Sequence, residues 1–296
     1  MKTLWLLIKR NTKLFFKDKG LFFTSLITPL ILLILYITFL GNVYRDSFEM
    51  AFPEGMNIPG KLLDAAVAGQ LISSLLAVCC VTVAFCSNML MVQDKVTGAR
   101  KDLTITPVKG TTLALGYYIS TLLSTLLICL VAIGAGFLYL GKIGWYLSGT
   151  DVALLLLDVF LLVMFGVALS SIINFFLSTQ GQISAVGSIV SSMYGFICGA
   201  YMPISQFGEG LRNTLAFLPG TYATSLLRNH TLRGVFAELK ADGYPQEVID
   251  VLKDAIDCNV YFFDTKVPLS TMHLILGGSV VVLIAIYILM NVFKKK

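Results

Sequence analysis

Six long apolar stretches constrain this chain more than any other feature. They cover about residues 21–43, 66–92, 113–140, 153–177, 183–202 and 271–293. A helix needs about 20 mostly apolar residues to cross roughly 30 Å of hydrocarbon. Composition agrees, because 56% of the 296 residues are hydrophobic and 13% are charged, whereas a soluble domain carries about 25% charged residues. The sequence therefore predicts an all-α integral membrane protein with six transmembrane helices.

The first stretch, 21–43, follows basic residues, as the core of a secretion signal does. Its apolar part is about 20 residues long, which exceeds the 7 to 15 residues of a signal peptide core. The segment that follows it lacks a small-residue cleavage site. We expect a permanent span.

The distribution of basic residues predicts the orientation in the membrane. Cytoplasmic loops next to spans carry an excess of Lys and Arg. Residues 1–20 hold six basic groups and one acidic group, residues 93–112 hold four and two, and residues 294–296 are three lysines. Segments 44–65 and 203–270 have the opposite bias, with two basic against four acidic and six against eight. We expect both termini in the cytoplasm and the protein in a plasma membrane, of the bacterial cytoplasmic type. The net charge of +5 then reflects topology, and no nucleic-acid partner is expected.

Residues 1–20 have the pattern of an amphipathic helix. Its basic residues Lys2, Lys9, Arg10, Lys13 and Lys17 gather on one side of a helical wheel, and its apolar residues occupy the other side. Such a helix lies in the cytoplasmic interface with its basic face toward anionic lipid headgroups. Membrane lipid is the first expected partner, and the helix could also brace a cytoplasmic protein.

Residues 93–110, which we name the elbow, interrupt the apolar pattern with six charged residues. Each charge would cost about 2.5 to 3.5 kcal/mol at the centre of a bilayer, so the elbow must lie outside the hydrocarbon. Gly98 can end one helical piece, and Pro107 restricts Thr106 to extended conformations. The pattern predicts two short helical pieces with a fixed break, able to pass force from a cytoplasmic protein to the second and third spans.

The segment 203–270, after the fifth stretch, predicts a small extracellular cap. Within 204–218, apolar residues repeat every three or four positions over a length too short to cross the membrane. This favours a short re-entrant helix or helical hairpin. Residues 243–259 have the apolar stripe of a surface helix, with Pro245 near its start.

The fifth stretch carries a row of small residues on one helix face: Ser184, Ser188, Ser191, Gly195 and Gly199. Small faces let membrane helices approach closely. Packing within the chain, a seam between two copies and a pore wall are all compatible with this row.

Clustered catalytic groups are not evident. The two histidines, His230 and His273, both fall near the predicted outer boundary, and no cysteine pair has metal-ligand spacing. The stretch GFLYLGKI at 136–143 resembles a phosphate-binding loop, but Ile143 replaces the Ser or Thr that would hold Mg²⁺. We expect no catalytic residue, no metal and no cofactor bound by this chain.

Asp158 is the ionisable residue that lies within a predicted span. An ion-driven carrier needs such buried groups to hold its coupling ion. A structural or hydration role, substrate contact and proton coupling are open for Asp158. An ion-coupled secondary transporter is therefore the alternative functional class.

Several motifs occur in a fixed order along the chain. The elbow holds Asp94, Gly98 and Thr106-Pro107-Val108; after the fifth stretch come Gly199, Tyr201, Pro203, Leu211-Arg212, Pro219-Gly220-Thr221-Tyr222-Ala223 and Arg228. In this order and spacing the chain resembles the permease subunits of ABC-2 type ATP-binding cassette exporters. The resemblance covers the whole chain, although 229–267 is longer than in many polysaccharide-exporting members.

The resemblance implies a transmembrane subunit without enzymatic activity of its own. Two permeases, identical or related, would assemble with two ATPase subunits that bind the ATP and Mg. It assigns the ATPase contacts to the elbow, which acts as a coupling segment: Asp94, Lys95, Thr97, Gly98, Arg100 and Lys101. It assigns a re-entrant gate region to Tyr201, Pro203, Phe207, Leu211, Pro219 and Tyr222.

The substrate class follows from the few charges in the spans. We expect an amphipathic or hydrophobic compound such as a drug, a peptide antibiotic or a lipid. A glycan or lipid-linked polymer is the alternative, for which Tyr117, Tyr118, Tyr194 and Tyr201 could supply aromatic platforms.

Overall fold

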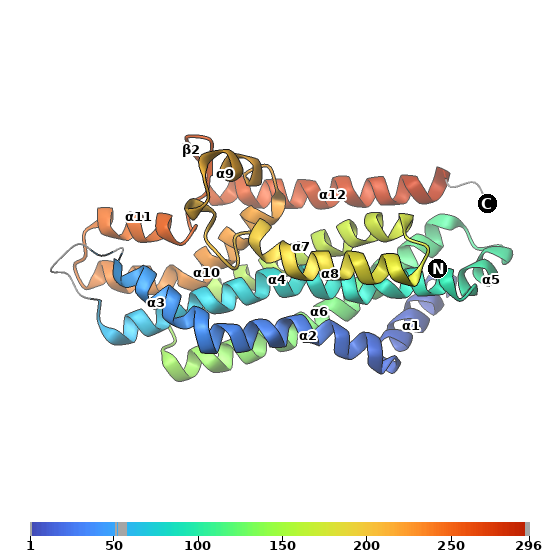
Figure 1. Cartoon of the computed structure of the whole chain (residues 1–296), viewed down its shortest axis with the longest axis horizontal. Coiled ribbons are helices and arrows are strands. Elements are labelled where there is room, and N and C mark those ends of the chain that lie inside the picture. The colour runs from blue at the N-terminus through green and yellow to red at the C-terminus, as the bar shows by residue number, and fades with distance from the viewer. Residues whose placement is uncertain (1, 51, 53–57, 294–296) are drawn as a thin grey trace.

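The computed structural model of the protein describes residues 2–50, 52 and 58–293, which form an elongated bundle of helices (Figure 1). The first half of the chain contains α1 (Lys2–Lys17), α2 (Lys19–Leu35), the π-helical turn η1 (Tyr36–Leu40), α3 (Gly41–Met50), α4 (Gly60–Val96), α5 (Ala99–Ile105) and α6 (Gly110–Ile143). The second half contains α7 (Gly149–Phe176), α8 (Gln180–Ile197), the 3₁₀ turn η2 (Ile204–Gln206), α9 (Glu209–Leu215), α10 (Pro219–Ala241), α11 (Gln246–Ala255), strands β1 (Tyr261–Phe262) and β2 (Thr265–Lys266), and α12 (Leu269–Phe293). The two strands pair antiparallel.

Several helices begin where the sequence supplies a capping side chain. The Asp18 carboxylate accepts a hydrogen bond from a backbone N–H in the first turn of α2. Reciprocal capping boxes start α7, between Ser148 and Asp151, and α8, between Thr179 and Gln182. These side chains satisfy N–H groups that have no partner inside the helix. They fix the helix boundaries within the long apolar runs.

Helix α4 is the axis of the bundle. It is buried along nearly its whole length and packs against α2, α6, α7, α8 and α10. The crossing with α7 is close because Gly166 lies there. A Cβ at Gly166 would come within 3.1 Å of the Val81 Cα and 3.2 Å of the Cys80 carbonyl oxygen. A glycine therefore lets the two backbones meet.

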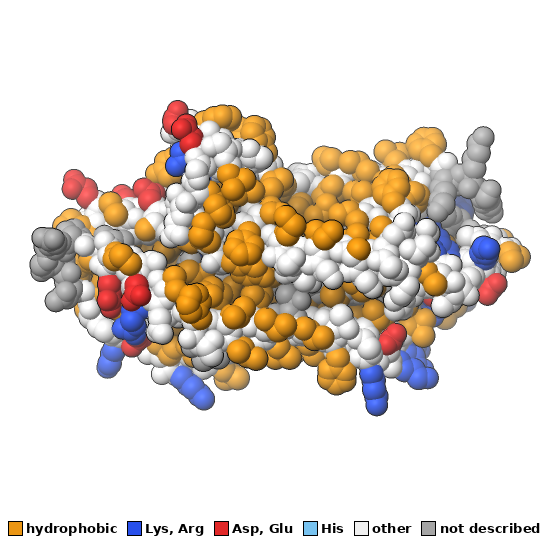
Figure 2. All heavy atoms as spheres, viewed as in Figure 1, with side chains coloured by type: hydrophobic (Ala, Val, Ile, Leu, Met, Phe, Trp, Pro, Cys, Tyr) orange, Lys and Arg blue, Asp and Glu red, His pale blue; other side chains and the backbone are white. Residues whose placement is uncertain are grey.

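Five helical segments of the described chain are long and apolar enough to cross a membrane: the continuous run Lys19–Met50, α4, α6, α7 and α12. Helix α8 is not among them, since its serines and glutamines lower its hydropathy. The prediction of a multi-span helical membrane protein is confirmed, and the sixth span stays a prediction that would fall on α8. Figure 2 agrees with this picture, because charged side chains gather toward the two ends of the long axis and apolar ones cover the middle.

Two of the segments predicted to face the cytoplasm, 1–20 and 93–112, meet at one end of the bundle, and the third, 294–296, lies outside the described residues. The start of α1, helix α5 and the end of α12 all lie at the right-hand end of Figure 1. Segments far apart in the sequence thus share a side, as the charge bias requires. Which side of the membrane this end faces stays a prediction.

The segment 203–270 differs from the expected external cap in one respect. Helix α11 forms as predicted, with Val248, Ile249 and Leu252 buried. Helix α10, however, is not peripheral, because it packs against α4, α7 and α12. Its polar side chains find partners inside the bundle, which hydropathy alone could not reveal.

The row of small residues on α8 is covered only in part. Gly195 and Gly199 are buried, whereas Ser184 and Ser188 are exposed and Ser191 is half-buried. Packing within the chain therefore accounts for one end of the row. The other end is free to form a pore wall or a seam with a second copy.

Candidate functional site

The elbow has the two-piece form that the sequence predicts. Helix α4 ends at Val96, Gly98 adopts a left-handed φ of +84°, and the short helix α5 follows. Thr106 is extended, with ψ of 157°, before Pro107. Glycine favours the left-handed region because it lacks a Cβ. The break between the two pieces is thus encoded by Gly98 and Pro107.

Asp94 lies inside the bundle at the root of the elbow. Its two oxygens accept hydrogen bonds from both terminal nitrogens of Arg10, at 2.7 and 3.1 Å, and from the Tyr117 hydroxyl at 2.6 Å. A forked arginine–carboxylate contact of this kind is strong and directional. The hydrogen bond with Asp94 raises the pKa of Arg10, against the opposing effect of burial. This cluster joins α1, α4 and α6.

Lys95 also turns inward. Its Nζ donates to the carbonyl oxygens of Asn174, Phe175 and Leu177, each at 2.7 Å. These carbonyls belong to the C-terminal end of α7, where a cation is favoured by the helix dipole. The side chains of Asp94 and Lys95 are thus bound within the chain, and a direct contact of either with an ATPase stays a prediction.

The outer face of the elbow presents other side chains. Thr97 and Lys101 are exposed, as is Asp102. Ile105, at the end of α5, has 84% of its surface exposed. Arg100 is half-buried and its guanidinium lies 3.5 Å from the Asn291 amide oxygen near the end of α12. Ile105 was not among the residues predicted to contact the ATPase. An isoleucine within so polar a segment could have indicated such a contact.

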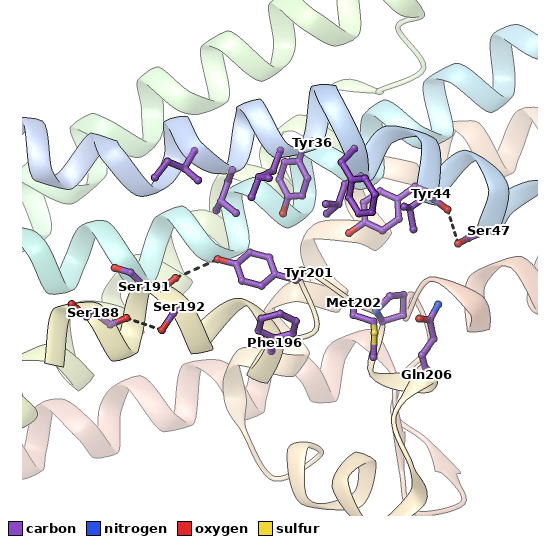
Figure 3. Close-up of a pocket in the computed structure, with 17 residues that line it drawn as sticks. Tyr36, Tyr44, Ser47, Ser188, Ser191, Ser192, Phe196, Tyr201, Met202 and Gln206 are labelled. Carbon is purple, nitrogen blue, oxygen red and sulfur yellow. Dashed lines mark hydrogen bonds between the residues drawn. The ribbon is translucent and has the colours of Figure 1, made fainter. Parts of the chain in front are cut away.

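A groove of about 610 Å³ opens between α2, η1 and α3 on one side and α8 with residues 201–206 on the other. We call it the α2–α8 groove. Figure 3 shows Tyr36 and Tyr44 on one wall facing Tyr201 on the other. Ser188 on α8 also faces it, and most of its remaining lining is apolar. The groove can hold a compound with a large apolar body.

The Tyr36 hydroxyl differs from those of Tyr44 and Tyr201, which also line the groove, in its hydrogen bonding. Tyr36 is 2% exposed, and its hydroxyl oxygen finds no hydrogen-bond partner among the described residues. By contrast, the Tyr44 hydroxyl donates to the Ala200 carbonyl at 2.9 Å, and the Tyr201 hydroxyl to the Ser191 carbonyl at 3.4 Å. A buried hydroxyl without a partner costs free energy. A polar group of a bound compound could satisfy it.

The residues predicted to form the gate region are only partly brought together. Tyr201 and Pro203 line the groove, and the Tyr201 ring packs edge-on against Phe196 at 5.0 Å between centroids. Tyr222 is buried and donates to the Ala216 carbonyl. Four of the six predicted residues, Phe207, Leu211, Pro219 and Tyr222, do not line the groove. Leu211 is 49% exposed.

Arg228 holds the gate region from inside. Its guanidinium donates to the Gly199 carbonyl at 2.5 Å and to the Ser74 hydroxyl at 3.3 Å, and it lies 3.5 Å from the Asp257 carboxylate. Asp257 in turn accepts from the backbone N–H groups of Ile204 and Ser205. Burial raises the pKa of Asp257, which Arg228 and these N–H groups oppose. The motifs in the sequence pointed to Arg228, but they did not identify Asp257 as its partner.

Asp158 lies on α7 and is fully buried. One oxygen is 2.5 Å from His230 Nδ1 on α10, and the other is 2.9 Å from His273 Nε2 on α12. Helices α7 and α10 meet a second time at Asp151, which pairs with Arg233 at 2.5 Å. The sequence analysis named Asp158 and the two histidines separately and did not bring them together. The role of Asp158 stays a prediction.

Long apolar helices, charged ends and a polar elbow between α4 and α6 define a multi-pass helical membrane protein. The sequence profile of the ABC-2 type transporter family matches residues 2–231. The chain therefore belongs to the ABC-2 type transporter family. A search of curated proteins found no match.

Family membership sets the coarse role of the chain. A permease domain of this family is the transmembrane component of an ATP-binding cassette transporter and is not itself catalytic. It works with an ATP-binding cassette ATPase subunit. The resemblance drawn from the motifs in the elbow and the gate region is confirmed.

Proposed function

We propose that this chain is the permease subunit of an ATP-driven exporter that moves an amphipathic or hydrophobic compound out of the cell. The α2–α8 groove is the observation that carries this proposal. It offers one buried hydroxyl without a partner, Tyr36, within a mostly apolar lining. That combination suits a molecule with an apolar body and a small polar group.

Export of a glycan or lipid-linked polymer is the second candidate, and the positions of the tyrosines weigh against it. Sugars stack on exposed aromatic platforms. Tyr117, Tyr118 and Tyr194 are buried in the bundle, and the first two donate hydrogen bonds to Asp94 and to a backbone carbonyl. Tyr201 alone of the four lines the groove. One platform is too few for a polymer track.

An ion-coupled carrier would need its coupling group in contact with the substrate path. Asp158, the candidate from the sequence, is enclosed by two histidines and does not line the α2–α8 groove. Family membership further favours ATP as the energy source.

The elbow supports coupling to the ATPase in two parts. Its outer face, with Thr97, Lys101 and Ile105, would dock on the ATPase. Its root, with Asp94 and Lys95, would pass the motion on to α1, α6 and α7, to which those side chains are bound. ATP binding moves the permease only if this contact differs between the open and closed ATPase states. ATP and Mg would be held by two ATPase subunits.

A second permease, identical or related, would complete the transporter. The groove opens on a face of α2 and α8 that carries exposed Ile189 and Met193. The exposed end of the serine row, with Ser184 and Ser188, lies on α8 as well. A partner permease on this face would close the groove into a path between the two copies. The elbow end would face the cytoplasm of a plasma membrane.

The deciding experiment is transport by the purified permease with its ATPase in proteoliposomes. A fluorescent amphipathic dye should accumulate only when ATP is supplied. Ser188→Trp, which fills the groove, should lower the transport rate at least several-fold while ATPase binding persists. Gly278→Trp is the control, because Gly278 lies on α12, has open space around it and does not line the groove.

Two results would overturn the proposal. The first is dye transport driven by a proton gradient with no ATPase present. The second is ATP-dependent transport of a lipid-linked oligosaccharide with no transport of the dye. Equal transport by the Ser188→Trp and wild-type proteins would remove the groove from the path.

A further inference from the structure

Asp158, His230 and His273 form a cluster to which three helices, α7, α10 and α12, each contribute one side chain. The side chains of Asp158 and His230 are 1% and 5% exposed, and that of His273 is 24% exposed. One ligand atom from each lies within 4.8 Å of the other two. The partners are 72 and 115 residues from Asp158 in the sequence. Neither the proposed export path nor the elbow uses these groups.

The hydrogen bonds of His273 indicate that the cluster needs a cation between His273 and Asp158. Its Nδ1 lies 2.9 Å from the Leu269 carbonyl oxygen, which can only accept, so Nδ1 carries the hydrogen. In the neutral ring, Nε2 then turns a lone pair toward the Asp158 carboxylate, 2.9 Å away. A lone pair and a carboxylate oxygen repel each other at that distance. A cation between them removes the conflict, and it is either a proton or a metal ion.

The donor set favours a metal ion. Two imidazoles and one carboxylate suit Zn²⁺ and similar ions, whereas Mg²⁺ and Ca²⁺ prefer oxygen ligands throughout. The bond from His273 Nδ1 to a backbone carbonyl is the outer contact that typically orients a metal-bound histidine. We propose that Asp158, His230 and His273 form a binding site for a divalent transition metal ion of the Zn²⁺ class.

The geometry needs little adjustment to accept the ion. With metal–ligand distances of about 2.1 Å, neighbouring ligand atoms of a tetrahedral site lie about 3.4 Å apart. The observed separations of 2.5 and 2.9 Å between Asp158 oxygens and the two histidine nitrogens would open by less than about 1 Å. The partly exposed His273 gives the ion an entry path, and a solvent molecule would take the fourth position. A bound ion would tie α7, α10 and α12 together.

The test uses the full chain in detergent and Co²⁺ as a visible substitute for Zn²⁺. The wild-type protein should bind one Co²⁺ per chain with the absorption of a tetrahedral site, and Zn²⁺ should displace it. His273→Gln should weaken binding by about 10- to 100-fold or more. His273→Cys, which keeps a ligand, should retain one Co²⁺ and add a sulfur-to-cobalt charge-transfer band. That band reports ligation and does not depend on transport.

Asp151→Asn is the matched control, because Asp151 lies on the same helix and pairs with Arg233 instead. It should leave Co²⁺ binding unchanged. The proposal is overturned if the wild-type protein binds neither Co²⁺ nor Zn²⁺ in a one-to-one ratio, in which case the cluster holds a proton. It is equally overturned if binding is the same in the wild type and in His273→Gln.

Discussion

Two arginine–carboxylate pairs meet α4, one near its end at Asp94 and one near its middle at Ser74, and they differ in how water reaches them. At the elbow, the side chains of Arg10 and Asp94 are 33% and 7% exposed. In the gate region, those of Arg228 and Asp257 are 1% and 8% exposed. The two carboxylates are about equally buried, so the arginines make the difference: Arg10 can be hydrated when it parts from Asp94, whereas Arg228 would stay buried without its partner. The difference indicates an elbow that can rearrange and a gate region with a fixed internal support.

The largest effect is expected from removing the enclosed pair. Arg228→Met leaves Asp257 buried and unpaired, and it removes donors to the Gly199 carbonyl and the Ser74 hydroxyl. Breaking a buried pair on one side costs about 3 to 5 kcal/mol. Denaturant titration of the purified protein, followed by circular dichroism, measures this loss in the free energy of unfolding.

The control for that change is Arg45→Met. Arg45 pairs with Asp64, and their side chains are 41% and 45% exposed. Exposed pairs contribute about 0 to 1 kcal/mol. Similar losses for Arg228→Met and Arg45→Met would show that the gate region has no special internal support.

A smaller loss is expected at the elbow. Arg10→Met removes the forked contact to the buried Asp94, which keeps its hydrogen bond from Tyr117. Because Arg10 is one-third exposed, solvent screens the lost attraction and limits the cost to about 1 to 2 kcal/mol. A double-mutant cycle with Asp94→Asn isolates the pair itself. Hydrogen exchange should show α1 loosening while α10 stays protected. Loosening of both helices together would contradict the distinction between the two pairs.

Disturbing the break in the elbow should lower the free energy of unfolding by less than Arg10→Met does. Gly98→Ala places a Cβ on a residue with φ of +84°, which costs about 1 kcal/mol. Gly141→Ala in α6 is the control, because Gly141 has ordinary helical geometry and open space around it. Thermal unfolding of the two variants measures the difference. A Gly98→Ala protein as stable as Gly141→Ala would mean that the turn is not held in the left-handed form.

The smallest effect on stability is expected on the outer face of the elbow. Ile105→Glu and Lys101→Glu change exposed side chains and should alter the free energy of unfolding by less than about 0.5 kcal/mol. Both should nevertheless weaken binding of the ATPase and lower the transport per ATP hydrolysed. Ile105→Val is the conservative control. Undiminished coupling in Ile105→Glu would place the ATPase contact elsewhere.

Local features were predictable from the sequence because the residues that cause them are adjacent. Gly98, Thr106 and Pro107 were enough to predict the break in the elbow. The apolar runs predicted the long helices, and the amphipathic pattern predicted α1. In each case, a few neighbouring residues determine the backbone geometry.

Contacts between distant segments could not be predicted in this way. Arg10 and Asp94 are 84 residues apart, and a hydropathy profile counts each as a separate charge. Helix α10 was placed outside the bundle for the same reason. Its Arg228, His230 and Arg233 look like the residues of a solvated helix until their carboxylate partners are known. Those partners are Asp151 and Asp158 on α7 and Asp257 after α11, and a single sequence does not show that they meet α10.

The length of α4 has a consequence for how force would travel. A helix of 37 residues is about 55 Å long, which is well beyond the roughly 30 Å of hydrocarbon. Ser74 and Asp94, where α4 meets the two arginines, are separated by about 30 Å along the helix axis. One uninterrupted rod thus reaches from Arg10 to Arg228 across a full membrane thickness. A twist applied at its elbow end would reach the opposite side of the membrane without a break in the helix to absorb it.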